Sequence, residues 1–278
     1  MNVNSAVLAY FSPTSTTKNI LGKISEGMGV DTVDVVDFTL SKNPDISCIE
    51  SQKASSQIAV LGAPVYGGRL PLEAVNRFKL LKGDNRPAVV VVTYGNRAYE
   101  DALLELKDLA LELGFKPIAA AAFIGEHSFS TKKIPIAFGR PDADDINKAL
   151  EFGKNIKDKL SALQSSKKQI AQLDKMAGDL KIPGNFPYKE RHASPPIAPI
   201  TDEDTCVKCG VCAEVCPTDA VTVGDTVETK AELCLRCCAC IKNCPTGARE
   251  MVNPKMIEIA QWLNTNFSAR KEIETFLR

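Results

Sequence analysis

The chain has 278 residues, with 34 basic and 34 acidic side chains and ten cysteines. This length suits two domains, and the balanced charge argues against nucleic acid as a partner. The first residues lack the basic start and cleavage site of a signal peptide, and no apolar run approaches a membrane span, so we expect a cytoplasmic protein without a membrane partner.

The amino-terminal part of the chain alternates apolar runs with helical stretches. The run over residues 6–11 is typical of a strand buried on both faces of a parallel sheet, and further strand candidates cover residues 33–38, 57–63, 87–93 and 115–124. Helical stretches lie near 71–81 and 98–113, and apolar positions recur at helical spacing from Asp142 to Leu163. The pattern predicts an α/β doubly wound parallel sheet, with ligands outside the carboxyl ends of its strands.

A turn rich in hydroxyl groups follows the first predicted strand, where a helix begins. It contains Ser12, Thr14, Ser15, Thr16 and Thr17. Hydroxyls and free backbone amides at such a point can surround a phosphate. A Ser/Thr-rich turn alone is usually only a helix cap, but its place after the first strand favours an anion site. It is not a P-loop, because the glycines and the GK[ST] ending are missing.

Two further loops follow the third and fourth predicted strands. The first contains Pro64, Val65, Tyr66, Gly67 and Gly68, and the second contains Thr93, Tyr94, Gly95, Asn96 and Arg97. An aromatic residue beside glycine lets the backbone approach a flat ring closely. Either loop alone is more often a plain turn, but together they favour a flavin. Arg69 and Arg97 would stabilise an anionic reduced flavin if they faced it, and the alternative is that both point into solvent.

Over residues 1–165 this pattern resembles a flavodoxin. The resemblance implies a five-stranded sheet in the order 2-1-3-4-5 and an FMN cofactor. The FMN phosphate would lie on residues 12–17, and the ring would lie between the Tyr66 and Tyr94 loops. The sequence departs from the flavodoxin turn at Ser15, where glycine is usual. No G-x-G-x-x-G follows a strand, so no dinucleotide site is visible.

The segment 125–141 is too long for a simple connection and follows the fifth strand, so it is a candidate lid. His127 in this segment would be either a proton donor facing the flavin or a hydrogen-bonded structural residue. Lys132, Lys133 and Arg140 would dock an acidic surface or an anionic substrate, or form a solvated basic loop. Cys48 has no metal-spaced neighbour and is interpreted as a structural thiol.

The carboxy-terminal part begins with a connector. Residues 166–200 are predicted to contain a polar helix reaching Leu180 and a linker with five prolines between Ile182 and Ile200. A cysteine-rich domain is predicted for residues 201–250, with a short hairpin from 221–223 to 227–229. Residues 251–278 are predicted to form a helix in which Trp262 is the packing anchor, with a redox relay as the less favoured alternative.

Nine of the ten cysteines lie in two runs, CVKCGVCAEVCP and CLRCCACIKNCP, whose first cysteines are 28 residues apart. Both read C-x2-C-x2-C-x3-C-P, in which three thiolates bind one cubane and the fourth is aimed at the other cluster. Structural zinc usually takes separated pairs of cysteines, and disulfides would need an oxidising compartment. The spacing therefore favours iron-sulfur clusters.

The two runs resemble a two-cluster bacterial ferredoxin, and this resemblance implies two [4Fe-4S] clusters with shared ligands. One cluster would be held by Cys206, Cys209, Cys212 and Cys244. The other would be held by Cys234, Cys237, Cys240 and Cys216. Cys238 stands where the first run has Gly210, so we interpret it as a packed thiol, although a C-x3-C pairing with Cys234 is conceivable.

The combination of both parts resembles the iron-sulfur flavoproteins of anaerobic microbes. Clusters pass single electrons, whereas FMN can hold one or two. Three hypotheses follow. The protein would be an oxidoreductase whose clusters feed FMN to reduce a small-molecule acceptor, an electron carrier between redox protein partners, or an NAD(P)H-dependent flavin reductase. The missing dinucleotide motif disfavours the third hypothesis.

Overall fold

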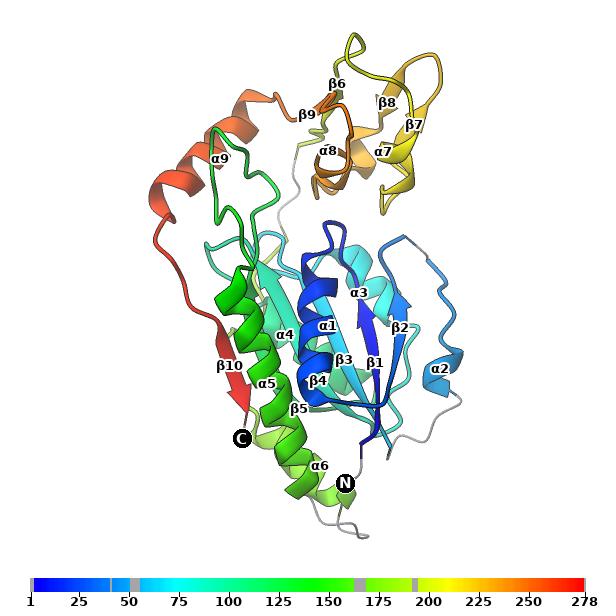
Figure 1. Ribbon diagram of the computed structural model, residues 1–278, viewed down its shortest axis with the longest axis vertical. Coiled ribbons are helices and arrows are strands. Elements are labelled where there is room, and N and C mark those ends of the chain that lie inside the picture. Colours follow the sequence, from blue (N-terminus) through cyan, green and yellow to red (C-terminus); the bar gives the residue numbers. More distant parts are fainter. Residues whose placement is uncertain (1–2, 41, 51–55, 163–168, 192–194, 278) are drawn as a thin grey trace.

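A computed structural model describes residues 3–40, 42–50, 56–162, 169–191 and 195–277 of the chain. Its central sheet contains five parallel strands, β1 (Ser5–Tyr10), β2 (Thr32–Asp37), β3 (Gln57–Pro64), β4 (Pro87–Tyr94) and β5 (Lys116–Ile124). They lie in the order 2-1-3-4-5, which confirms the predicted order. Their carboxyl ends point toward the cysteine-rich module, residues 200–250 (Figure 1).

A sixth strand, which the sequence analysis missed, completes the sheet. The prediction of a helix over 251–278 is correct only in its first part, because α9 (Pro254–Asn266) is followed by β10 (Glu274–Leu277). This strand pairs antiparallel with β5, with Phe276 opposite Ala120. Without β10, β5 would present an unpaired row of backbone groups at the sheet edge. The end of the chain thus returns to the first domain and covers this edge.

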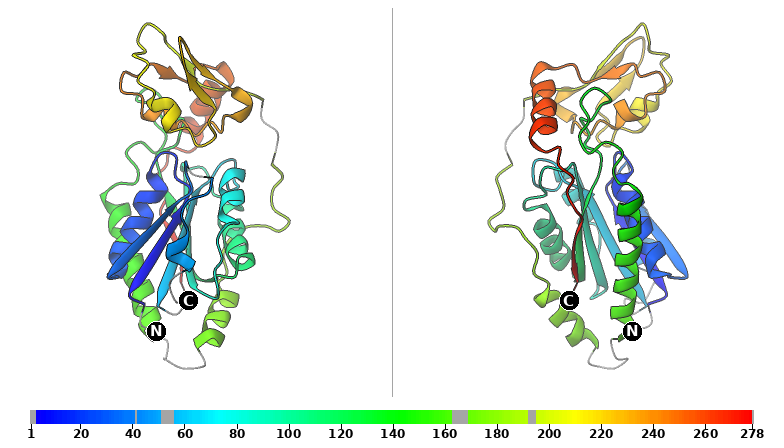
Figure 2. Two further views of the ribbon diagram at one scale, coloured as in Figure 1. Left: turned by 90° about the vertical axis from the view of Figure 1, so that its right-hand side faces the viewer. Right: turned by 60° about the vertical axis from the view of Figure 1, so that its left-hand side comes forward.

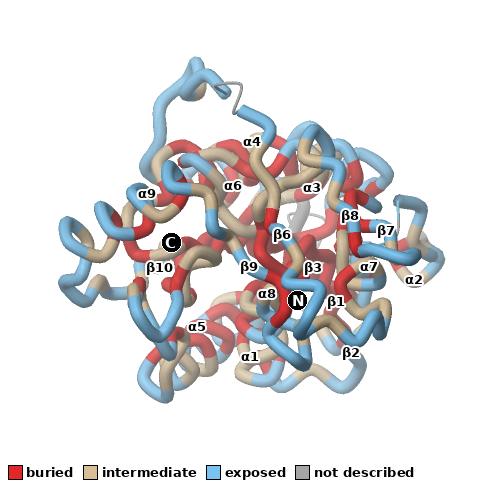
Figure 3. The backbone as a smooth tube through the Cα atoms, turned by 90° about the horizontal axis from the view of Figure 1, so that it is seen from above, coloured by how far each residue is buried: buried red, intermediate tan, exposed pale blue. Residues whose placement is uncertain are grey.

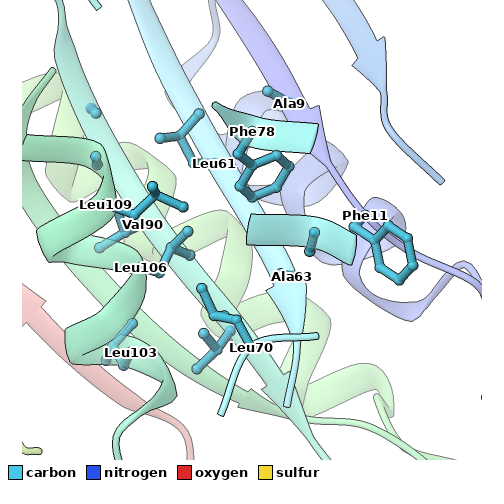
Figure 4. Packing of buried hydrophobic residues seen from close by; sticks show 14 of the residues in the cluster. Ala9, Phe11, Leu61, Ala63, Leu70, Phe78, Val90, Leu103, Leu106 and Leu109 are labelled. Atoms are coloured by element: carbon cyan, nitrogen blue, oxygen red, sulfur yellow. The ribbon is translucent and has the colours of Figure 1, made fainter. Parts of the chain in front are cut away.

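Helices cover both faces of the sheet. One face carries α1 (Thr16–Met28) and α5 (Ala143–Ala162), and the other carries α3 (Leu72–Phe78) and α4 (Ala102–Glu112). Figure 4 shows the second face, where Phe78, Leu103 and Leu106 pack on strand residues such as Leu61 and Val90. Figure 3 shows buried positions gathered inside the domain and exposed loops around it.

A close contact between two helices fixes α1, whose first turn carries the predicted anion site. A Cβ atom added at Gly153 of α5 would lie 2.1 Å from the Ile24 carbonyl oxygen, and one added at Gly27 of α1 would lie 2.0 Å from that of Leu150. Only glycine leaves room for this approach of the two backbones. The helix is therefore held tightly against α5.

The connector between the two parts is fixed on the first domain. After α6 (Gln169–Asp179), the described residues 180–191 and 195–199 form no helix or strand, as predicted. The Asp101 carboxylate accepts hydrogen bonds from the backbone amides of Asn185 (2.8 Å) and Lys189 (2.7 Å), and the Tyr188 hydroxyl donates to Asp108 (2.6 Å). The connector therefore runs along the α4 side of the domain (Figure 2). The predicted helix and linker also included residues 163–168 and 192–194, which lie outside the described residues.

The cysteine-rich module contains two short antiparallel pairs and three short helical segments. The pairs are β6 (Ile200–Thr201) with β9 (Arg249–Glu250), and β7 (Val221–Val223) with β8 (Val227–Thr229). The second pair confirms the predicted hairpin. The helical segments are α7 (Val211–Glu214), η1 (Ala231–Leu233) and α8 (Ala239–Lys242). In the first domain, α2 (Ser47–Glu50) is similarly short.

The helix α9 packs against the segment 125–141. Ala260 and Leu263 of α9 form one apolar cluster with Ile136. Trp262 is 52% exposed and contacts only Phe267 edge-on among the described aromatic rings, so its prediction as the packing anchor was wrong. No helix in the described part of the chain has the length and apolar character that crossing a membrane requires.

Candidate functional site

The hydroxyl-rich turn after β1 contains a residue in the backbone conformation that favours glycine. Ser15 adopts a left-handed conformation with φ +62°, which explains how it replaces the glycine that is usual here. The Ser15 amide donates to the Ser12 carbonyl (3.1 Å), and the Ser12 hydroxyl accepts from the Lys18 amide (3.1 Å). In the described part of the chain, the amides of Thr14, Thr16 and Thr17 have no hydrogen-bond acceptor. Free amides at the start of a long helix suit an anion.

The Thr17 hydroxyl is committed to a neighbouring strand. It lies 2.6 Å from the hydroxyl of Thr93 at the end of β4, and both residues are buried. A hydroxyl pair shares one proton between its oxygens and leaves the other proton free to donate. The pair therefore joins the turn to β4, in addition to any contact that it makes with a phosphate.

The turn opens into a cavity of about 300 Å³ at the carboxyl ends of the strands. Four loops after β1, β3, β4 and β5 form its floor. They contribute Ser12, Pro13, Thr14, Thr16, Thr17, Pro64, Val65, Tyr66, Gly67, Thr93, Tyr94, Gly95 and residues 125–129. Its roof comes from the carboxy-terminal part, through Leu235 and Arg236 of the module and Met256 and Ile259 of α9. The cavity thus lies between the two parts of the protein, and the sequence analysis did not foresee its roof.

Four predicted cofactor residues do not line this cavity: Ser15, Gly68, Asn96 and Arg97. Asn96 instead donates from its side-chain amide to the carbonyls of Phe267 (2.6 Å) and Ala269 (2.9 Å), which holds the segment after α9. Gly68 packs against the Glu100 side chain. These residues belong to the loops around the cavity, and their assignment as direct cofactor contacts stays a prediction.

The two arginines that were expected to face the ring are paired elsewhere. Arg69 makes two hydrogen bonds of 2.8 Å to the Glu105 carboxylate and stacks on the Tyr188 ring. Arg97 forms an ion pair with Glu100. Neither side chain lines the cavity, so the hypothesis that they stabilise an anionic flavin lacks structural support.

Of the two predicted tyrosines, only Tyr66 is free of the core. Tyr94 is 5% exposed and packs edge-on against Tyr99, with ring centres 5.4 Å apart, and this burial raises its pKa to about 12. Tyr66 sits on a tight turn, in which its amide donates to the Arg69 carbonyl (2.9 Å) and its carbonyl accepts from the Arg69 amide (3.2 Å). Burial raises the pKa of Tyr66, and negative charge on the nearby sulfur atoms of Cys237 and Cys238 would raise it further. Tyr66 therefore stands between the cavity and the module.

His127 lines the cavity as a neutral side chain. Its Nδ1 accepts from the Phe129 amide (3.0 Å), which places the proton on Nε2. Burial, followed by the charges of Arg97 and Lys242, lowers its pKa from 6.5 to about 4. The ring packs over Gly95, where a Cβ atom would lie 2.2 Å from His127 Cδ2. His127 can donate a hydrogen bond near neutral pH, but it carries no acidic imidazolium proton there.

The rest of the segment 125–141 is less basic than its sequence indicates. Lys132 and Lys133 are exposed, whereas Arg140 is buried and pairs with Asp145 through its Nε and Nη2 atoms. Lys242 of the module forms an ion pair of 2.7 Å with Glu126. The segment therefore joins the module and α9 to the first domain instead of standing free as a lid.

The cysteines gather in two groups inside the module. Cys206, Cys209, Cys212 and Cys244 line one small cavity. Cys216, Cys234, Cys237 and Cys240 line another. None of the ten cysteines forms a disulfide bond. The structure thus brings together the two predicted sets, each with its fourth member from the other run, and we call them the first and second thiol sets.

Cys238 also lines the second cavity, and its thiol has a backbone hydrogen-bond acceptor. Its thiol donates to the Arg236 carbonyl (3.5 Å), and its backbone is left-handed at φ +59°, as is that of its counterpart Gly210 at φ +84°. The packed-thiol interpretation is compatible with these contacts. Cys48 packs against the core of the first domain, away from both sets.

Backbone amides point at the sulfur atoms in the same way in both runs. The amide of Lys208 lies 3.4 Å from Cys206 Sγ, and the amide of Arg236 lies 3.4 Å from Cys234 Sγ. Burial raises the pKa of Cys237 to about 12 and also raises that of Cys240. Such hydrogen bonds and burial are features that set the potential of thiolate-bound clusters.

Arg249, which the sequence analysis did not single out, is buried between the two thiol sets. It lines the first cavity and donates from Nη2 toward Cys240 Sγ of the second set, at 3.8 Å. In the sequence, the only sign of this role was the position of Arg249 five residues after the last cysteine.

Comparisons with known proteins gave one family match and several similar structures. The family described as 4Fe-4S binding domain matches residues 199–222, which contain the first cysteine run. Among curated proteins, no sequence matches the chain.

The similar structures include three flavodoxin-type proteins. A flavodoxin from the domain Archaea has 15% identity and a TM-score of 0.36, over 56% of this chain and 99% of that one. A flavodoxin, WrbA-like protein from Agrobacterium tumefaciens has 12% identity and a TM-score of 0.41, over 57% and 98%. Flavodoxin 1 from Bacillus cereus has 18% identity and a TM-score of 0.36, over 58% and 99%. By its strand order and its 4Fe-4S match, the chain joins a flavodoxin-like domain to a ferredoxin-type module.

Proposed function

We propose that this protein is an electron-transfer flavoprotein that passes single electrons between two [4Fe-4S] clusters and FMN. One observation carries the proposal. Leu235 and Arg236, which stand between the thiols of Cys234 and Cys237, line the same cavity as the hydroxyl-rich turn of the first domain. The second thiol set and the flavin site therefore share a wall.

The residues of the cavity fit FMN. The free amides of Thr14, Thr16 and Thr17 at the start of α1 would hold the phosphate, together with the Thr14 hydroxyl. Tyr66 would border the ring on the module side, and the His127 Nε2 proton would be available to a ring acceptor. When bound, FMN takes up one or two electrons, whereas each cluster exchanges one.

The thiol sets fit [4Fe-4S] clusters. Each thiol set supplies four cysteines to its cavity, which is the number of ligands that a cubane takes, and the second cavity is also lined by Cys238. The amides of Lys208 and Arg236 would donate to ligand sulfur atoms, and buried Arg249 would supply a positive charge between the sets. We infer two clusters, and not one, because the second thiol set has the same cysteine spacing as the first.

For the outlet, we propose that electrons leave through FMN to an acceptor. The cavity volume of about 300 Å³ lies at the low end of small-molecule pockets, which run from roughly 300 to 1,000 Å³. FMN would take up most of this volume, so an acceptor that reached the ring would be small. This supports a small acceptor, or a single-electron outlet, over a nicotinamide dinucleotide.

The test uses full-length protein reconstituted anaerobically with iron, sulfide and FMN. We expect one FMN and about eight irons per chain, two cubanes of four. After rapid mixing with a reduced one-electron donor, flavin absorbance should bleach at a rate that depends on the second thiol set. Cys237→Ala should keep FMN but bleach much more slowly, whereas Cys48→Ala, a thiol outside both sets, should behave as wild type. Equal bleaching rates in both variants, or protein that binds no FMN, would overturn the proposal.

A further inference from the structure

The two cysteine runs give the module two equivalent faces. Aligning the runs on their cysteines pairs Val207 and Lys208 with Leu235 and Arg236, and pairs Glu214 with Lys242. It also pairs residues 245–247, Pro-Thr-Gly, with residues 217–219, Pro-Thr-Asp. The environment of each position on one face can therefore be compared with that of its counterpart on the other.

The face around the second thiol set is docked on the first domain. Leu235 and Arg236 roof the cavity, and Lys242 donates to Glu126 (2.7 Å) and to the Ser130 carbonyl (2.9 Å). The Arg77 guanidinium donates to the Pro217 carbonyl, and Lys42 pairs with Asp219 at 2.9 Å. On this face, each of the three aligned segments, 235–236, 242 and 217–219, therefore contacts the flavodoxin-like domain.

The equivalent face around the first thiol set is open. Val207 is 65% exposed, and Lys208, Glu214, Pro245 and Gly247 are all exposed. Cys209 of the first set is itself exposed. Within the described residues, none of these positions has a hydrogen bond or ion pair outside the module, and the Lys208 ammonium donates to the nearby Asp225 carbonyl. We call Val207, Lys208, Glu214 and residues 245–247 the open face.

We propose that the open face is the docking surface for a separate one-electron redox protein with a basic rim. The proposal rests on the proposed function, because it takes the second set as the contact with the flavin and the first set as the contact with the outside. Each encounter moves one electron between the partner and this protein, so that one is oxidised and the other reduced, and no bond is made or broken.

Charge complementarity identifies the kind of partner. On the docked face, the positive Lys242 meets the negative Glu126. The same position on the open face carries Glu214, so a partner docked in the same manner presents a cation there. The exposed carboxylates of Asp202, Glu203 and Asp204 precede Cys206 and extend the same charge. Opposite charges at the rim of an interface chiefly raise the rate of association.

The test uses cytochrome c, a basic one-electron redox protein, as the probe. Fully reconstituted protein is reduced, freed of reductant and mixed anaerobically with oxidised cytochrome c, and haem absorbance gives the second-order rate constant. The variant is Glu214→Lys. The matched control is Glu151→Lys, an equal charge reversal at an exposed position of α5.

We expect Glu214→Lys to lower the rate constant roughly fivefold or more at low ionic strength, and the loss to shrink as salt is added. Glu151→Lys should match wild type. As a readout independent of electron transfer, carbodiimide cross-links to cytochrome c lysines should map to Glu214 and to residues 202–204.

The outcomes separate the docking surface from the proposed function. Equal rate constants in the two variants, or cross-links confined to other surfaces, would overturn the open face as the docking site. Cross-links at Glu214 between two copies of this chain would assign the face to self-association and overturn it as well. Wild-type protein that binds neither iron nor FMN would instead overturn the proposed function, and the docking surface with it.

Discussion

The Nη2 atom of Arg249 lies 3.8 Å from the Sγ of Cys240, although Arg249 lines the cavity of the other thiol set. The side chain is 2% exposed, and its Nη atoms donate to the hydroxyls of Thr201 (2.6 Å) and Thr229 (2.7 Å). The described residues supply no carboxylate to pair with it, and its Nε has no hydrogen-bond partner there. A buried cation without a counter-ion is costly, so this arrangement suits a site in which thiolate-bound clusters provide the negative charge.

Replacing Arg249 should therefore shift both cluster potentials. Reduction adds negative charge, which a nearby guanidinium stabilises. We expect Arg249→Met to lower the potentials of both clusters by an amount on the order of tens of millivolts, as measured by titration followed by electron paramagnetic resonance. Arg249→Lys keeps the charge and should shift them much less. Equal shifts in both variants would show that the charge is not responsible.

The exchange of ligands between the two runs can be tested by iron content. Cys216 belongs to the first run but lines the second cavity with Cys234, Cys237 and Cys240. Cys216→Ala should thus lose about four of about eight irons and the signal of the second cluster, and Cys244→Ala should lose those of the first. Cys238→Ser should keep both clusters. A loss of about four irons in Cys238→Ser would contradict the assignment of Cys238 as a packed thiol.

The two threonines of the hydroxyl-rich turn should differ in their effect on FMN. Thr14→Val removes the hydroxyl of a residue that lines the cavity, and a hydrogen bond to a charged group contributes roughly 1.5 to 3 kcal/mol. The Kd for FMN should therefore rise roughly tenfold or more, whereas the Kd for riboflavin, which lacks the phosphate, should not change.

Thr17→Val should instead act on stability, because the Thr17 hydroxyl is paired with Thr93 in a buried position. Leaving the Thr93 hydroxyl unpaired costs about 1 to 3 kcal/mol, which thermal unfolding would detect. Fluorescence titration with FMN and riboflavin separates the two variants. Identical losses of FMN affinity would mean that the Thr17 hydroxyl also binds the phosphate.

The left-handed backbone at Ser15 carries a cost that glycine would relieve. Because Ser15 has φ +62°, Ser15→Gly should raise stability by up to about 1 kcal/mol, after the added freedom of the unfolded chain is allowed for. Ser15→Val should lower stability, since a β-branched residue is strained at this φ. Thermal unfolding of both variants checks the sign. A loss of stability in Ser15→Gly would show that the serine side chain contributes more than its backbone strain costs.

The lowered pKa of His127 predicts a pH dependence of stability. Between its ordinary value of 6.5 and its folded value of about 4, the unfolded chain binds a proton that the folded chain does not. The neutral ring therefore contributes fully above pH 6.5, and this contribution is lost as the pH falls toward 4. His127→Gln removes the titrating group. The difference in unfolding temperature between wild type and His127→Gln should narrow or reverse on acidification, and a constant difference would contradict the pKa.

The sequence by itself determined the parts and their local chemistry. Apolar runs such as residues 87–93 form buried parallel strands wherever helices can cover both faces, so the strands were predictable, whereas their order was implied by the resemblance to flavodoxins. The cysteine spacing likewise placed Cys216 and Cys244 in opposite sets, because a short backbone segment limits which thiols can reach one cavity.

Only the tertiary structure decided how these parts meet. The sequence could not show that Tyr94 packs in the core while Tyr66 faces the module, because both follow a strand and precede a glycine. It could not show that Arg69 pairs with Glu105, or that Leu235 roofs the flavin cavity while its counterpart Val207 is exposed. These outcomes depend on contacts between residues far apart in the chain. The strand β10 also depends on a distant contact. Its four residues form a strand because the edge of β5 is available to pair with them.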